Sequence, residues 1–142
     1  MVYNKLKIIL LTLFFLFICI GSMILYNTVS NDAKNQRLDT PNKILEFAVK
    51  NINTKAPILL DDSTRLDYAS ATSETELIYN YTIISRDSFE SKKKQIKLIE
   101  PSLRRKILTN DDMNIFRDNG IEIIYLYYDI DGREIAKIKV KW

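Results

Sequence analysis

The sequence predicts an α+β domain of order α-β-β-α-β-β, with a four-stranded antiparallel sheet whose helices pack on one face. Three observations predict this class. Apolar residues recur at helical spacing in some segments and at every second position in others, and Asp131-Gly132 separates two of the alternating segments. The segment from residue 40 to residue 142 is long enough for one small domain and too short for two.

The first helix is predicted over residues 41–52. Thr40 can cap an orphan amide of the first turn, and Pro41 is tolerated at the first helical position. The residues that follow form one apolar stripe at helical spacing, made of Ile44, Leu45, Ala48, Val49 and Ile52. We therefore expect this helix to bury one face.

Two strands are predicted after Pro57, over residues 64–72 and 76–85. In the second, the residues of both alternating faces are substantially apolar or aromatic, and one face carries Leu77, Tyr79, Tyr81 and Ile83. A longer helical region begins at Asp87 or Ser88, and its apolar face carries Phe89, Ile96, Ile99, Leu103 and Ile107. Pro101 should break or restart this helix near Glu100.

The C-terminal part predicts one more helical turn and a hairpin. Asn110 and Asp111 can cap a short helix over residues 111–118, which Gly120 can end. Residues 121–129 and 133–142 then form strands around Asp131-Gly132, which supplies the positive backbone angles of a tight turn.

Residues 76–81, Glu-Leu-Ile-Tyr-Asn-Tyr, are echoed by residues 122–127, Glu-Ile-Ile-Tyr-Leu-Tyr. A duplicated helix-plus-hairpin unit would leave such a match. Strands that pair in one sheet also converge on alternating Ile and Tyr, because their packing demands are shared. The sequence leaves both explanations open.

Residues 8–26 form an uncharged apolar run that is nearly long enough to cross a bilayer as a helix. Lys5 and Lys7 precede it, so the positive-inside rule predicts a cytosolic segment 1–7, a transmembrane helix 8–26, a stalk 27–39 and an extracytoplasmic domain 40–142. We expect a single-pass protein of a bacterial inner membrane with a periplasmic domain. The alternatives are secretion after cleavage near residue 30 and lipid attachment at Cys19, which the bulky Ile18 disfavours.

Residues 57–138 carry several short motifs: Pro57 with Leu60-Asp61, residues 64–66, residues 77–82, Asn119-Gly120, residues 125–127 and residues 129–132. Together they resemble those of a loose group of small bacterial membrane-anchored proteins, of inner-membrane or lipoprotein-like type. Members of the group often carry cysteines after the first hairpin and near the C-terminus, and this chain has neither. The resemblance implies an envelope setting and no particular chemistry.

The composition excludes most catalytic classes. The chain has no histidine, its single cysteine lies in the apolar run, and its three glycines form no phosphate-binding loop. Asp61, Asp62 and Asp67, or Asp129 and Asp131, could form a carboxylate pair, but turn and loop chemistry accounts for them better. We therefore expect no enzyme, no cofactor and no metal.

The charge of the domain argues against a nucleic-acid partner. Removing Lys5 and Lys7 from the 21 basic residues leaves 19, against 18 acidic ones. A nearly neutral domain lacks the cationic surface on which nucleic-acid binding depends.

Two groups of side chains are candidate contact residues. Tyr79, Tyr81, Tyr125 and Tyr127 could form a partner-binding platform, or core if helices cover them. The basic residues that could contact a membrane surface or an acidic partner are Lys92, Lys93, Lys94, Arg104 and Arg105. The expected function is a noncatalytic, membrane-tethered interaction module, such as an accessory subunit of an envelope assembly. The alternative is an immunity-type inhibitor that blocks a toxic periplasmic enzyme.

Overall fold

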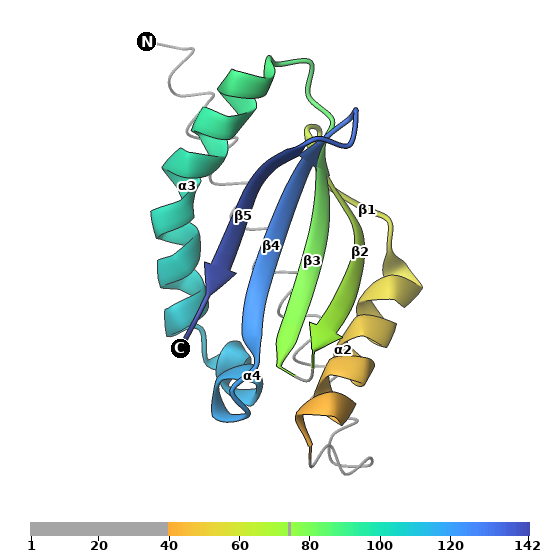
Figure 1. Cartoon of the computed structure of the whole chain (residues 1–142), viewed down its shortest axis with the longest axis vertical. Helices are drawn as coiled ribbons and strands as arrows, with labels where there is room; N and C mark the ends of the chain where they lie inside the picture. Colours follow the sequence, from red (N-terminus) through yellow and green to blue (C-terminus); the bar gives the residue numbers. More distant parts are fainter. Residues whose placement is uncertain (1–39, 74) are drawn as a thin grey trace.

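The computed structural model describes residues 40–73 and 75–142 (Figure 1). The predicted cytosolic segment 1–7, membrane span 8–26 and stalk 27–39 lie outside this range. None of the helices within it is both long enough and apolar enough to span a bilayer. The elements follow in the order α2 (Pro41–Lys55), β1 (Ile58–Asp61), β2 (Thr64–Ser73), β3 (Glu76–Ile83), α3 (Phe89–Thr109), a 3₁₀ turn (Asp111–Met113), α4 (Asn114–Asp118), β4 (Glu122–Asp129) and β5 (Glu134–Val140).

The α+β class is confirmed, but the predicted four-stranded antiparallel sheet is wrong. The described part of the chain forms one five-stranded sheet of order β1-β2-β3-β4-β5, in which β3 and β4 run parallel and the other pairs run antiparallel. The parallel pair arises because α3 carries the chain back to the end of the sheet where β3 began, as a crossover connection does. The strand that sequence reasoning missed, β1, has four residues and no clear alternation.

Helix α2 begins as predicted and runs three residues past the predicted end, to Lys55. The Thr40 side chain accepts a hydrogen bond from the backbone amide of Lys43 at 3.5 Å. Ile44, Leu45, Ala48 and Ile52 are buried, which confirms the predicted apolar stripe.

Helix α3 passes through Pro101 without a break, contrary to the prediction. A proline inside a helix costs about 3 kcal/mol, because it removes one hydrogen bond and crowds the preceding turn. Pro101 is exposed, and the residues on the other side of the helix stay in register: Ile96, Ile99, Leu103 and Ile107 are all buried. Burial of this continuous stripe offsets the local cost.

The helices pack against one face of the sheet. Residues at odd-numbered positions of β3 and β4, such as Leu77 and Ile123, share one buried cluster with apolar residues of α2, α3 and α4. Helix α2 lies against β2 and β3, and α3 lies against β5 at the far edge (Figure 1). The expectation that the helices occupy one face therefore describes this part of the chain correctly.

The predicted C-terminal hairpin is present, with its strands one to two residues shorter at the ends. Gly132 has a φ of +77°, the left-handed conformation that glycine adopts without steric cost. The Asp129 carboxylate accepts hydrogen bonds from the amides of Asp131 and Arg133, at 3.0 and 2.8 Å. The acidic residues around this turn thus hold the hairpin together.

Candidate functional site

The two echoed segments are neighbouring strands. They pair in parallel and in register over their whole length, so that Glu76 lies beside Glu122, Tyr79 beside Tyr125 and Tyr81 beside Tyr127. Matching positions therefore share one environment, which is the pairing explanation that the sequence left open. The alternation of the strands sends the tyrosines to one face and the glutamates to the other.

The four tyrosines lie on the helix-covered face. Their rings stack, with centroids 5.4 Å apart for Tyr79 and Tyr125 and 5.2 Å apart for Tyr81 and Tyr127. All four side chains are at least 94% buried, and burial raises the pKa of each phenol above its ordinary value of 10.0. The structure thus places these predicted contact residues in the core, the second of their two interpretations.

The opposite face of the sheet carries a second set of apolar and aromatic side chains. We call this set the open face: Leu59, Tyr68, Ile78, Ile124, Leu126 and Tyr128. None of the six belongs to the core cluster that joins the described helices to the sheet. Leu59 and Tyr68 are 61% and 51% exposed and Leu126 and Tyr128 are half-buried, whereas Ile78 and Ile124 are buried.

The strand register brings these residues together. Tyr68 of β2 lies beside Asn80, which lies beside Leu126. In the adjoining row, Ile78 pairs with Ile124. The residues of the open face therefore occupy neighbouring rows of β2, β3 and β4, in which Ile78, Asn80 and Ile124 are buried, and Leu59 lies beside Arg65 at the β1 edge.

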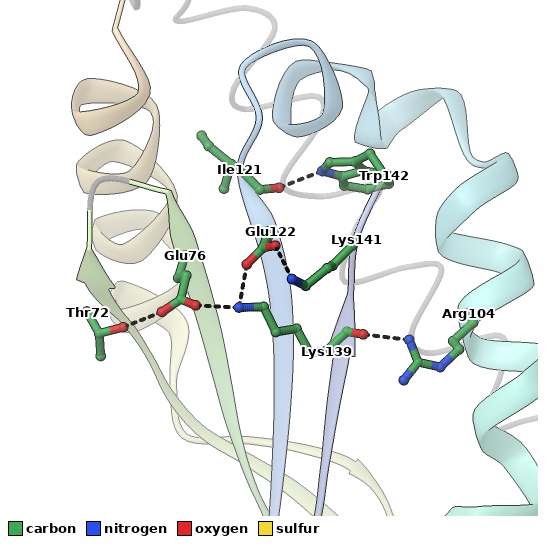
Figure 2. A network of polar contacts seen from close by, with 8 residues as sticks. All are labelled: Thr72, Glu76, Arg104, Ile121, Glu122, Lys139, Lys141 and Trp142. Carbon is green, nitrogen blue, oxygen red and sulfur yellow. Dashed lines mark hydrogen bonds and ion pairs between the residues drawn. The ribbon is translucent and has the colours of Figure 1, made fainter.

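An ion-pair network borders one end of the open face (Figure 2). The parallel register sets the carboxylates of Glu76 and Glu122 side by side, an arrangement that like-charge repulsion opposes. Lys139 reaches across from β5, and its Nζ lies 2.7 Å from Glu76 Oε1 and 2.5 Å from Glu122 Oε2. Thr72 donates to Glu76, and Lys141 lies 3.3 Å from Glu122.

The opposite charges in this network stabilise one another. The hydrogen bond from Lys139 lowers the pKa of Glu76 and of Glu122, and the two carboxylates in turn raise the pKa of Lys139. Both glutamates are ionised at neutral pH, so neither can donate a proton as a general acid. The network forms a fixed polar rim beside the apolar open face.

The basic residues predicted from the α3 sequence divide between two sides of the helix. Lys92 is buried, and Arg104 binds Glu100 and the backbone carbonyl of Lys139 on β5. Lys93, Lys94 and Arg105 are exposed. Only the last three are placed to contact a membrane surface or an acidic partner.

Three of the candidate acidic residues, Asp61, Asp67 and Asp129, have clear structural partners. Asp61 accepts from the amide of Ser63 in the β1–β2 turn, at 2.6 Å, and Asp67 accepts from Thr82 and pairs with Arg65. Asp129 binds the turn amides and the guanidinium of Arg133, at 2.7 Å. In the described ranges no group of three or more acidic, histidine or cysteine side chains could hold a metal ion.

Sequence reasoning did not find Leu59 and Tyr68. Leu59 lies on the unpredicted strand β1, and the register of β2 shifts at Asp67, between Leu66 and Tyr68. A bulge of this kind breaks the two-residue alternation from which a face is predicted. No local pattern could therefore have assigned Tyr68 to the open face.

The sequence of this domain matches a protein-family model. The match covers residues 39–136, which run from just before α2 into β5. The chain belongs to the family described as Domain of unknown function (DUF8479). A comparison with curated proteins finds no match for this DUF8479 chain.

Two solved structures share the fold of the DUF8479 chain. One is a Pseudomonas aeruginosa protein described as secreted, with a TM-score of 0.62 and 13% identity, over 71% of this chain and 88% of that one. The other is the type II secretion system pilotin AspS from Vibrio cholerae, with a TM-score of 0.54 and 16% identity, over 77% and 94%. At these identities the likeness concerns the fold alone.

Proposed function

We propose that this protein is a noncatalytic interaction module of a bacterial cell envelope and that its partner binds the open face. The observation that carries the proposal is a set of apolar and aromatic side chains that lies outside the core cluster of the described domain. Large apolar side chains exposed together on a protein surface commonly mark an interaction site.

The composition of this surface fits a protein partner. Leu59 and Tyr68 are exposed at one side, Tyr128 and Leu126 are half-buried, and the network around Lys139 lies at the end of the face beyond Ile78 and Ile124. Protein interfaces combine an apolar, aromatic centre with a polar rim in this way. Tyrosine is a frequent anchor, because its ring buries a large area and loses little rotamer freedom.

Three further observations support the envelope setting. The fold is also that of a pilotin and of a protein described as secreted. The sequence resembles small bacterial membrane-anchored proteins, and residues 8–26 are predicted to span a membrane. A membrane tether would hold the open face near other envelope proteins.

The engaged carboxylates support a noncatalytic role. The carboxylates of Glu76, Glu122 and Asp129 each form an ion pair with a lysine or arginine side chain, and Asp129 also accepts hydrogen bonds in a turn. A catalytic carboxylate pair needs one group that stays protonated near neutral pH and a space between the two for substrate. The lowered pKa values of these three groups oppose such a role; for Asp129, hydrogen bonds from Arg133 outweigh the effect of burial.

A photocrosslinking experiment tests the proposal. Benzoylphenylalanine would replace Tyr68 in the full chain, and in a matched control it would replace Glu46, which is exposed on α2. We expect a specific protein adduct in cells from position 68 and none from position 46. The captured protein should bind the purified full chain, and Leu59→Ser with Tyr68→Ser should weaken that binding at least about tenfold.

Two results would refute the proposal. Equal capture from positions 68 and 46 would mean that the open face is not selective. Unchanged affinity of the double variant would mean that the partner binds elsewhere. The nature of the captured protein separates an assembly subunit from an inhibitor, since an inhibitor would capture an enzyme.

A further inference from the structure

We propose that the outer side of α3 is a second binding surface, which docks on an anionic phospholipid bilayer. We call this surface the outward stripe: Lys94, Lys97, Leu98, Arg105 and Leu108. It goes beyond the proposed partner site, because it lies on a helix, and that helix packs on the sheet face opposite the open face.

The geometry of α3 defines the stripe. The buried side of the helix carries Ile96, Ile99, Leu103 and Ile107. At 100° per residue, Lys94 and Arg105 project within about 20° of each other and nearly opposite Leu103. The stripe therefore faces away from the domain along most of a helix that is about 30 Å long.

The stripe carries a net positive charge. Lys94, Lys97 and Arg105 are exposed, and none of them forms an ion pair with another residue of the described domain. The acid at the middle of the helix, Glu100, is bound to Arg104. Glu90 is the exposed acid of the helix. It lies in the first turn, four residues before Lys94 on the same side, and balances part of this charge.

Exposed leucines lie among these cations. Leu98 is 70% exposed and Leu108 is 43% exposed, and both project on the same side as Lys94 and Arg105. Basic residues interleaved with leucine on one side of a helix suit the boundary between phospholipid headgroups and acyl chains. An acidic protein would satisfy the lysines and the arginine but would gain less from two separated leucines.

The sequence also supplies a reason for a bilayer to be nearby. Thirteen residues, 27–39, separate the predicted membrane span from the start of the domain. Even when fully extended, thirteen residues span at most about 45 Å. Tethering over such a distance would keep α3 at high effective concentration at the membrane surface.

Full-length protein in lipid nanodiscs tests this inference. Benzoylphenylalanine at Leu98 would report contact through lipid adducts identified by mass spectrometry, in discs of phosphatidylcholine with about 30% phosphatidylglycerol or of phosphatidylcholine alone. Each basic residue near an anionic surface contributes about fivefold to binding. We therefore expect at least about a tenfold lower adduct yield in the neutral discs and a clear loss in high salt.

Charge-reversal variants sharpen the test. Lys94→Glu with Arg105→Glu should reduce the adduct yield at Leu98 in anionic discs by at least about tenfold. Lys50→Glu with Lys55→Glu on α2 changes the net charge equally and should leave the yield unchanged, because both lysines lie off the stripe. A probe at Tyr68 should give no lipid adduct.

Several outcomes would overturn the inference. They are equal yields in anionic and neutral discs, adducts at Leu98 with a second copy of the chain instead of lipid, and failure of the full chain to remain in discs. Lipid adducts at Tyr68 with none at Leu98 would place the open face on the membrane. That result would contradict the proposed function as well, whereas the other three would leave it intact.

Discussion

The two faces of the sheet carry side chains of similar type under different conditions. On the helix-covered face, four tyrosines stack and are almost fully buried. On the open face, Tyr68 is half exposed and Leu59 more so, and a network of charged side chains borders one end of this face. The comparison teaches that tyrosine content alone does not locate a contact surface, because the same residue type serves the core on one face and is available to a partner on the other.

The largest expected effect is a loss of folding stability in alkaline solution, caused by the buried tyrosines of the helix-covered face. Burial raises the pKa of Tyr79, Tyr81, Tyr125 and Tyr127, so these phenols keep their protons in the folded state when the unfolded chain has lost them. The stability that these buried phenols contribute is fully present below pH 10. As the pH rises above 10, the free energy of unfolding falls by about 1.4 kcal/mol per pH unit for each tyrosine. Urea unfolding between about pH 9 and pH 11 measures this slope.

A single substitution provides the control for this slope. Tyr127→Phe keeps the ring and removes one ionisable group, so the slope should fall by about 1.4 kcal/mol per pH unit. Phenolate absorbance that develops near pH 10 in the folded protein from all eight tyrosines would show that the stack is not buried.

The next largest effect is that of removing a stacked ring. Tyr127 is 1% exposed, and Tyr127→Ala should lower the free energy of unfolding by about 4 kcal/mol, because it leaves a cavity and removes its contact with Tyr81. Urea unfolding at neutral pH measures the change. A loss below about 1 kcal/mol would place Tyr127 outside the core.

Breaking the ion-pair network should change the free energy of unfolding less than removing the Tyr127 ring does, and the change should depend on pH. Lys139→Met leaves Glu76 and Glu122 side by side without their shared cation, so the variant should be less stable than the wild type at pH 7. Because folding lowers the pKa of both glutamates, their ionised forms stabilise the folded state at pH values above 4.5, their ordinary pKa. This stability is lost as the pH falls through the lower pKa values of the folded state.

The variant should therefore lose less stability than the wild type between neutral pH and about pH 3. Lys137→Met, on the same strand, is the matched control and should change this acid slope less. Parallel acid slopes for wild type and Lys139→Met would mean that the network does not set these pKa values.

The smallest effect on stability belongs to the open face. Tyr68→Ser should change the free energy of unfolding by less than about 0.5 kcal/mol, because half of its side chain already lies in solvent. Calorimetry or urea unfolding checks this. A loss as large as that expected for Tyr127→Ala would mean that Tyr68 is a packing residue.

Local patterns predicted the elements better than their arrangement. The apolar stripe of α2 and the Asp131-Gly132 turn follow from spacing and turn chemistry, which act within a few residues. β3 and β4 pair in parallel because α3 returns the chain to the end of the sheet where β3 begins. No short segment of the sequence determines where that return ends. Pro101 shows the same limit, because tertiary burial outweighed a local signal that would otherwise end the helix.

The candidate site was predictable only in part. The echoed segments indicated that two strands share an environment, and the structure shows them in register. Two residues of the open face, Leu59 and Tyr68, could not be found, because they required the unpredicted strand β1 and the register shift at Asp67. On α3, the sequence located the basic cluster, but only packing separates Lys92 and Arg104 from the exposed cations.

Hydroxyl-radical footprinting of the full chain, alone and bound to its captured partner, tests the central claim most directly. We expect Tyr68 to oxidise rapidly in the free protein and to be protected in the complex, while Tyr79, Tyr81, Tyr125 and Tyr127 stay unreactive in both. Rapid oxidation of the stacked tyrosines in the free protein, or unchanged oxidation of Tyr68 in the complex, would contradict the division of the sheet into a core face and a partner face.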